Sequence, residues 1–102
     1  MVKFKNNKNI PLYSNVPTID LHGEDRKSAE LLVKQFLNDL CKLKCSKAII
    51  VHGIGTGILK KQVHDVLKYD KRVERYYIDF FNIGCTIVEF KENVWQKTGF
   101  ML

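Results

Sequence analysis

One strand-loop-helix stretch constrains the fold of this chain more than any other feature. The apolar run at 47–51 is too short for a helix and is typical of a strand buried on both faces. The next residues are His52-Gly53-Ile54-Gly55-Thr56-Gly57-Ile58-Leu59-Lys60-Lys61, and apolar residues then recur at helical spacing as far as position 67. Glycines let a ligand approach the main chain, and a helix that begins near Thr56 points unpaired N–H groups at the same place. The stretch therefore predicts a phosphate-binding loop, or alternatively a tight turn that binds nothing.

The other elements predict an α/β fold. A short strand over 18–21 places Ile19 and Leu21 on one face and Asp20 and His22 on the other. Residues 25–43 carry the apolar stripe of an amphipathic helix, and 73–81 and 86–90 have strand composition with a short connection typical of an antiparallel hairpin. The order predicts a two-layer βαβαββ sandwich of two helices and a mixed, mainly parallel four-stranded sheet.

This topology predicts where the polar residues gather. Right-handed crossovers place the carboxyl ends of the first two strands together, so Asp20, His22 and His52 should meet the loop at 53–57 at one rim. If the third strand is also parallel, the turn at 82–86 joins them. We expect a ligand site at this rim.

Positive charge is concentrated around the glycine loop. The formal net charge is +6, and residues 41–72 hold eight Lys and Arg against Asp65 and Asp70. Basic charge beside a phosphate-shaped loop favours a polyanion such as nucleic acid. A solvated helix face that only aids solubility explains the charge equally well.

The 102 residues correspond to one domain, preceded by an arm. Residues 1–16 are polar and basic without periodicity and predict a mobile arm, which leaves 17–102 as the domain. No signal peptide and no apolar run of about eighteen residues is present, so we expect a cytoplasmic protein with no membrane partner. Cys41, Cys45 and Cys85 lack paired spacing and are expected to be reduced packing residues rather than metal ligands.

Three sequence blocks resemble the small MutS-related domain, the Smr domain. Ile19-Asp20-Leu21-His22-Gly23 is similar to the family motif L-D-L-H-G, and residues 52–60 are similar to H-G-x-G-x-G-x-L-[KR]. Gly84-Cys85-Thr86-Ile87-Val88-Glu89-Phe90 resembles the closing strand G-x-T-x-V-x-[LF]. The chain begins with its own Met and lacks the ATPase region of larger relatives, so we expect a stand-alone member without an assumed role in mismatch repair.

The resemblance implies a fold similar to the C-terminal domain of bacterial translation initiation factor three, with nucleic-acid binding and endonuclease activity. Asp20 and His22 match the pair that the family uses for cleavage. The implied substrate-binding loop contains His52, Gly53, Gly55 and Lys60, and we include Thr56, Gly57 and Lys61 with it. A secondary substrate contact is expected at Asn82, Gly84 and Thr86, although this segment is shorter and less glycine-rich than in the family.

Phosphodiester cleavage requires an activated nucleophile, stabilised charge on the phosphate oxygens and a proton for the leaving group. His22 could transfer the proton with Asp20 orienting it, while the loop amides and Lys60 hold the phosphate and His52 serves as a second acid or base. Besides Asp20, only Glu24, Asp25 and Asp79 could help to bind metal, so we expect RNA cleavage through its 2′-hydroxyl without an obligatory metal, Mg²⁺ remaining an option.

Alternatives to these roles remain open. Asp20 could cap the first helix, His64 could be a plain surface residue, and the aromatic side chains at 76–81 are expected to pack in the core or hairpin rather than stack on bases. The main alternative function is a non-catalytic module that binds nucleic acid or a ribosome. We expect the protein to be a monomer. Binding of a small nucleotide is disfavoured because the G-x-x-x-x-G-K-[ST] spacing is absent.

Overall fold

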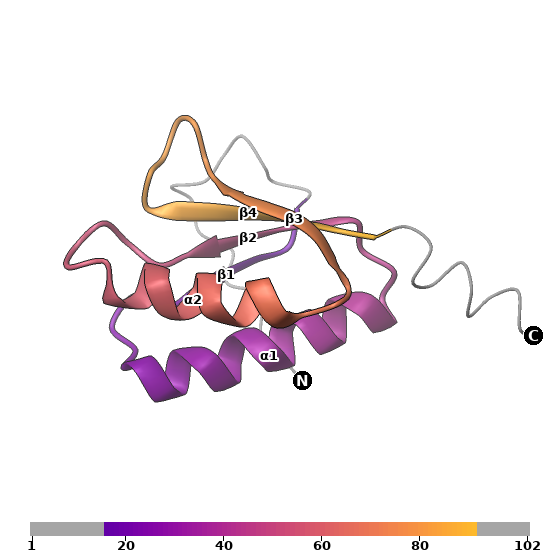
Figure 1. Cartoon of the computed structure of the whole chain (residues 1–102), viewed down its shortest axis with the longest axis horizontal. Coiled ribbons are helices and arrows are strands. Elements are labelled where there is room, and N and C mark those ends of the chain that lie inside the picture. The colour runs from indigo at the N-terminus through magenta and orange to yellow at the C-terminus, as the bar shows by residue number, and fades with distance from the viewer. Residues whose placement is uncertain (1–15, 92–102) are drawn as a thin grey trace, which may run out of the picture.

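The structure is a computed structural model that describes residues 16–91, and most of the predicted arm therefore lies outside the described residues. The elements follow the predicted order along the chain (Figure 1). They are β1 (Thr18–Asp20), α1 (Arg26–Lys42), β2 (Lys47–Val51), α2 (Ile58–Tyr69), β3 (Val73–Ile78) and β4 (Cys85–Phe90). The βαβαββ prediction is confirmed.

The sheet is mixed, with strand order β1-β2-β4-β3. β1 pairs with β2 in parallel, while β4 is antiparallel to both β2 and β3. Three strands thus run in the same direction, but only one of the three pairings is parallel. The prediction of a mainly parallel sheet holds for strand direction and not for pairing, because the β3–β4 hairpin returns β4 into the space between β2 and β3.

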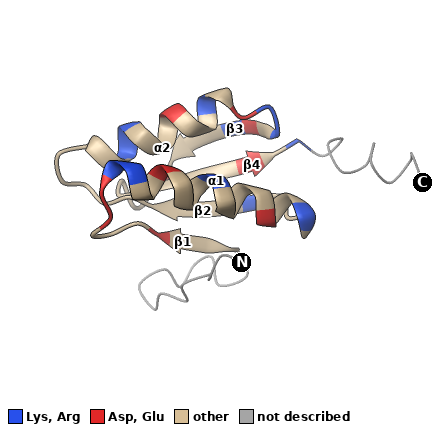
Figure 2. Cartoon of the chain, turned by 90° about the horizontal axis from the view of Figure 1, so that it is seen from below, with Lys and Arg blue, Asp and Glu red and all other residues tan. Residues whose placement is uncertain are grey.

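Both helices cover the same face of the sheet, which gives two layers (Figures 1 and 2). The apolar stripe of α1 is fully buried there against strand residues and α2, with Ala29, Val33, Phe36, Leu37 and Leu40 at its centre. Asp25 caps α1 by accepting the Ser28 N–H at 2.7 Å. The alternative that Asp20 caps this helix is therefore wrong.

The opposite face of the sheet carries a smaller apolar cluster. Ile49, Cys85 and Ile87 form it, and Val16 and Val51 pack against it. Because side chains alternate along a strand, Ala48 and Ile50 face the helices while Ile49 and Val51 face away. This confirms that β2 is buried on both faces, and it defines a helix-covered face and an outer face of the sheet.

The cysteines are free thiols, as expected. Cys41 and Cys45 pack against the main core, and Cys85 is buried in the outer cluster. Burial, with further contributions from Asp79 and Asp20, raises the pKa of Cys85 to about 11. Among residues 16–91, no three His, Cys, Asp or Glu side chains are grouped closely enough to hold a metal ion. No helix in the same range is long and apolar enough to cross a membrane.

Candidate functional site

Three connections meet at one edge of the sheet, which we call the rim and define as residues 21–25, 52–57 and 79–84 (Figure 1). The Leu21 N–H donates to the Val51 carbonyl at 2.8 Å, which holds the first connection to the second. The Gly84 carbonyl accepts from the N–H groups of both His52 and Gly53, each at 2.9 Å, which holds the third connection to the second. The predicted convergence of these segments is confirmed.

The glycines of the rim serve two different needs. Gly53 and Gly57 both have φ +82°, a left-handed conformation that other residues adopt at a cost. Gly84 allows close approach instead, because a Cβ atom there would lie 3.3 Å from the Gly53 Cα. Gly55 has neither restriction, since its φ is not positive and its surroundings are open.

Most main-chain N–H groups of the glycine loop have no acceptor among the residues that the structure describes. The Gly53 N–H is already bonded to Gly84, so it does not belong to the predicted cradle. No acceptor within residues 16–91 is described for the N–H groups at 54–57 or at 59 and 60. The N-cap Gly57 has no side chain to satisfy them, and the first turn of α2 contains no acidic residue. These donors and the positive end of the helix favour an anion.

Exposed cations lie at the starts of both helices. Lys60 and Lys61 lie in the first turn of α2, are exposed, and form no ion pair with any described residue. Arg26 and Lys27 are exposed at the start of α1, so both helices carry Lys or Arg at their first turns (Figure 2). We did not predict Arg26 and Lys27 as site residues. Their position at the start of the helix that follows the His22-Gly23 turn was the available signal.

Beneath the glycine loop, two imidazole rings share one hydroxyl group. The Thr86 Oγ1 lies 2.7 Å from His52 Nε2 and 2.8 Å from His64 Nε2, and His52 Nδ1 lies 2.9 Å from the Gly53 carbonyl. Because a carbonyl only accepts, His52 Nδ1 donates to it, and neutral His52 then accepts the Thr86 hydroxyl proton at Nε2. His64 donates to Thr86. The result is a directed chain from His64 through Thr86 and His52 to the main chain of the loop.

Burial lowers the pKa of both histidines in this chain. For His64 the neighbouring His52 and Lys60 lower the pKa further, and for His52 the hydrogen bond to Gly53 opposes the shift in part. Both rings are therefore neutral at neutral pH, as the directed chain requires.

Three predicted roles do not fit this arrangement. His52 is only 5% exposed and Thr86 is fully buried, so neither is placed to touch a substrate directly. His64 is half-buried against Thr86 and the Tyr76 ring, at 5.0 Å between ring centroids, so its description as a plain surface residue is wrong. Its position one turn from Leu67 was a signal that it borders the buried stripe of α2.

Asp20 lies on the outer face at the end of β1, and His22 follows it in a turn at the rim. Asp20 pairs with Val51, which pairs with Cys85, so these three side chains share the outer face of the sheet. The Asp20 Oδ1 accepts the His22 backbone N–H at 2.9 Å. The His22 ring is exposed, and the described residues provide it with no hydrogen-bond partner. The carboxylate therefore shapes the turn that carries His22 rather than holding the ring.

The third connection is built by two side chains. Asp79 is only 6% exposed, and its Oδ1 accepts the Phe81 N–H at 3.0 Å. The Asn82 Oδ1 accepts the Gly84 N–H at 3.0 Å, and the Asn82 carbonyl accepts the Cys85 N–H. Asn82 and Gly84 thus shape the turn beside the glycine loop.

The aromatic residues near this connection divide into two groups. Tyr76 packs against the core, as expected, but Phe80 and Phe81 are 88% and 78% exposed. The expectation that these two residues pack in the core or the hairpin is wrong. They lie beyond the end of β3, where the alternation of a strand no longer decides which face a side chain takes.

A hollow of about 470 Å³ lies elsewhere, between α1, α2 and the turn into β3. Its lining runs from Glu30 to Arg72 and includes none of the predicted site residues. The rim is therefore the candidate site, and it is an open surface.

Comparison with known sequences identifies one family. The model of the Smr domain matches residues 19–91. The Endonuclease MutS2 of Clostridium novyi (strain NT) is 32% identical over 90 residues, which are 85% of this chain and 12% of that protein. The Endonuclease MutS2 of Thermotoga maritima is 40% identical over 76 residues, which are 72% of this chain and 10% of that protein. The chain thus spans about a tenth of the length of these relatives.

Solved structures agree with this result. The Smr domain of Thermus thermophilus MutS2 superposes with a TM-score of 0.72 at 33% identity, covering 74% of this chain and 99% of that one. YdaL, a stand-alone small MutS-related protein from Escherichia coli, superposes with a TM-score of 0.70 at 17% identity, covering 72% of this chain and 63% of that one. The second likeness concerns the fold alone.

Proposed function

Because this chain belongs to the Smr domain family, we propose that it is an endonuclease that binds nucleic acid at the rim and favours RNA. One observation supports the proposal most: amide donors and lysines that have no described partner within residues 16–91 meet the Asp20-His22 turn at the same edge of the sheet. The curated relatives named as endonucleases contain a homologous domain.

The glycine loop would hold the phosphate. The N–H groups at 54–57 and at the start of α2 can donate to its oxygens, and Lys60 and Lys61 add full charges to the same place. His52 has a positioning role in this proposal. Its ring Nδ1 donates to the Gly53 carbonyl, and the backbone N–H groups of His52 and Gly53 both donate to the Gly84 carbonyl.

His22 would carry out the proton transfer. Its exposed imidazole can accept the proton of a ribose 2′-hydroxyl, whose oxygen then attacks the adjacent phosphorus atom. The bond to the 5′-oxygen breaks, and that oxygen takes a proton from water, since the rim is open to solvent. The products are a 2′,3′-cyclic phosphate and a 5′-hydroxyl. Asp20 would set the position of His22 through the turn.

This mechanism needs no metal ion. Asp20 and Asp79 both contribute to the raised pKa of Cys85, so each carboxylate lies near this thiol, and these two residues would be the ones to bind Mg²⁺ if it took part. We further propose that the protein acts as a monomer in the cytoplasm.

The test is a cleavage assay on labelled single-stranded and structured RNA, and on DNA of the same sequence, with Mg²⁺ or with excess chelator. We expect RNA cleavage in chelator, with cyclic phosphate ends. RNA whose single 2′-hydroxyl at the cleaved position is replaced by 2′-methoxy should resist at that position. Loss of all activity in chelator, or equal cleavage of DNA, contradicts the metal-free mechanism.

A binding module without activity is the second candidate. One observation favours it: within the described contacts, the Asp20 carboxylate bonds to the His22 main chain and not to the ring that it would have to orient. Such a module would bind RNA or a ribosome through the same loop. In that case the Asp20→Ala/His22→Ala variant and the unchanged protein bind RNA equally, and neither cleaves it.

A further inference from the structure

Two phenylalanines at the rim, Phe80 and Phe81, are largely exposed instead of packing in the core. Phe80 and Phe81 are 88% and 78% exposed, and their rings contact each other edge to face at 5.2 Å between centroids. Ile83 on the same connection and Ile54 and Ile58 at the glycine loop are also more than half exposed. Large apolar side chains that gather on a surface mark an interaction site more often than single exposed ones do.

The connection that carries these rings is well defined by hydrogen bonds. Asp79 holds it on one side, through its N–H to the Cys85 carbonyl and its carboxylate to the Phe81 N–H, each at 3.0 Å. Asn82 holds it on the other side through the Gly84 N–H. Both rings lie between these two anchors, so the main chain presents them at a set place.

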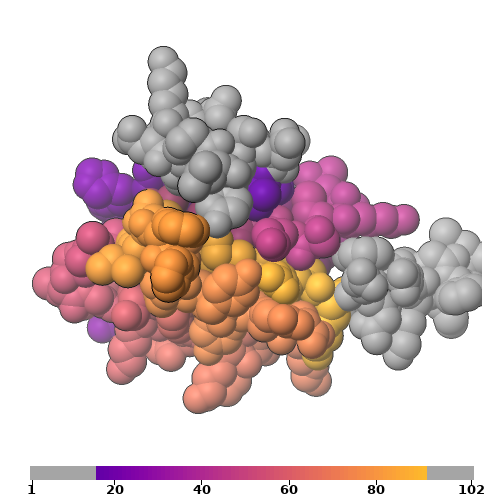
Figure 3. All heavy atoms as spheres, turned by 90° about the horizontal axis from the view of Figure 1, so that it is seen from above, coloured from indigo at the N-terminus to yellow at the C-terminus, as the bar shows by residue number. Residues whose placement is uncertain are grey.

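A further pair of hydrogen bonds joins the connection that carries the rings to the glycine loop. Gly84 accepts from the N–H groups of His52 and Gly53, which joins the aromatic connection to the glycine loop. The connection between β3 and β4 rises above the glycine loop at the same end of the molecule (Figure 1), and in the view from above its atoms lie at the surface (Figure 3). A nucleic acid whose phosphate lies on the loop amides would bring its bases toward these rings.

From this placement we propose that Phe80 and Phe81 form a stacking platform for unpaired bases, which makes single-stranded nucleic acid the substrate class of the rim. The inference rests on the proposed function. Paired bases are already stacked on their neighbours and cannot offer a free face, whereas an unpaired base can lie on an aromatic ring. Stacking is tolerant of sequence because every base has such a face.

The charge distribution favours bases over a lipid surface. The aromatic connection, residues 79–84, contains one acid and no Lys or Arg, whereas lipid-binding segments combine apolar residues with basic ones. The positive charge lies instead on the neighbouring helix start at Lys60 and Lys61, where phosphates would be bound. This separation of rings from cations matches the separation of bases from phosphates along one strand.

The experiment compares two ligands that share a backbone. One is a 2′-methoxy oligonucleotide, which lacks the attacking hydroxyl, and the other is the same length of abasic backbone. We expect the protein to bind the intact strand about tenfold more tightly than the abasic strand. The Phe80→Ala/Phe81→Ala variant should lose this difference and bind the abasic strand as before. Phe80→Trp should keep the difference, and Phe80→Leu should lose part of it.

Tyr69→Ala is the matched control, because Tyr69 is 78% exposed at the other end of α2. It should leave both affinities unchanged, and circular dichroism should show every variant folded. If the unchanged protein binds the intact and the abasic strand equally, or if the double variant loses the same affinity for both strands, the stacking platform is wrong but the proposed function is not. Binding of neither strand by the unchanged protein overturns the proposed function. Vesicle binding and self-association are measured for the same variants. If the double variant loses either of these while its affinity for the intact strand is unchanged, the rings contact a membrane or a second copy of the chain, and the platform is wrong.

Discussion

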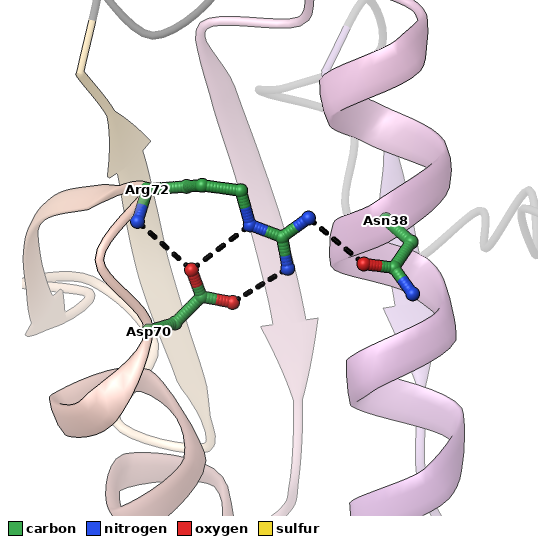
Figure 4. A network of polar contacts seen from close by, with 3 residues as sticks. All are labelled: Asn38, Asp70 and Arg72. Carbon is green, nitrogen blue, oxygen red and sulfur yellow. Dashed lines mark hydrogen bonds and ion pairs between the residues drawn. The ribbon is translucent and has the colours of Figure 1, made fainter.

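The two ends of the molecule treat polar groups in opposite ways. At the end away from the rim, Arg72 donates to both carboxylate oxygens of Asp70, at 3.0 and 2.7 Å, and to Asn38 of α1 at 2.8 Å (Figure 4). Burial would raise the pKa of Asp70, but the hydrogen bonds and charge of Arg72 outweigh it and hold the pKa below its ordinary value. This network ties the turn after α2 to α1.

At the rim, by contrast, donors and charges are left open. The N–H groups at 54–57, the ring of His22 and the side chains of Lys60 and Lys61 have no described partner among residues 16–91. Groups that satisfy one another stabilise the fold, whereas groups without partners are free to bind a ligand. Stability and function are thus expected to separate by location, and four experiments test that separation.

The largest effect is expected at His22. His22→Ala should reduce RNA cleavage by about 10²–10⁴-fold, because the proton acceptor is removed, while affinity for RNA and the free energy of unfolding stay unchanged. Cleavage rates under single-turnover conditions and urea unfolding measure the two properties. Gln35→Ala, at an exposed position of α1, is the control. A large loss of stability in His22→Ala would show that rim groups without described partners also support the fold.

Arg72→Ala is expected to have the opposite effect, because it should change stability and not cleavage. It leaves the Asp70 carboxylate without its main partner and should lower the free energy of unfolding by about 1–2 kcal/mol. RNA cleavage at a temperature where the variant is folded should not change. If the cleavage rate of the folded variant falls together with its free energy of unfolding in urea, the two ends of the molecule are coupled and the proposed separation is wrong.

The glycines sharpen the comparison within the rim. Gly57→Ala should cost about 1–2 kcal/mol of stability, because a Cβ atom is strained at φ +82°. It should also weaken RNA binding by moving the helix start. Gly55→Ala is the matched control, since Gly55 has no positive φ and no atom within 4 Å of the added carbon. Equal destabilisation by both changes would contradict the described loop.

The smallest effect is expected from pH. The pKa values of His52 and His64 are lowered in the folded state, so the unfolded chain binds more protons below pH of about 6.5. Their contribution to stability is complete above that pH and is lost as pH falls through the lowered folded values. Urea unfolding between pH 7.5 and pH 5 should show this loss, and His64→Gln should reduce it. An unchanged slope in that variant would exclude His64 as a contributor.

The sequence predicted well wherever a repeating pattern was present. The apolar stripe predicted the ends of α1 to within one residue, because a helix has a fixed period. The apolar run at 47–51 predicted β2 with the same bounds. The element order also predicted the convergence at the rim. Two strand-helix units followed by a hairpin leave few possible topologies, because crossovers between parallel strands are right-handed.

The side on which each site residue lies depended on tertiary structure. The run from Ala48 to Val51 is apolar on both faces, so it carries no alternation to show that His52 lies on the helix-covered face. Phe80 and Phe81 lie past the end of β3, where only the hydrogen bonds of Asp79 and Asn82 determine that they are exposed. The sequence by itself therefore determined the elements, the glycine positions and their meeting point. Packing decided which groups are buried beneath the loop and which face solvent, because burial depends on neighbours distant along the chain.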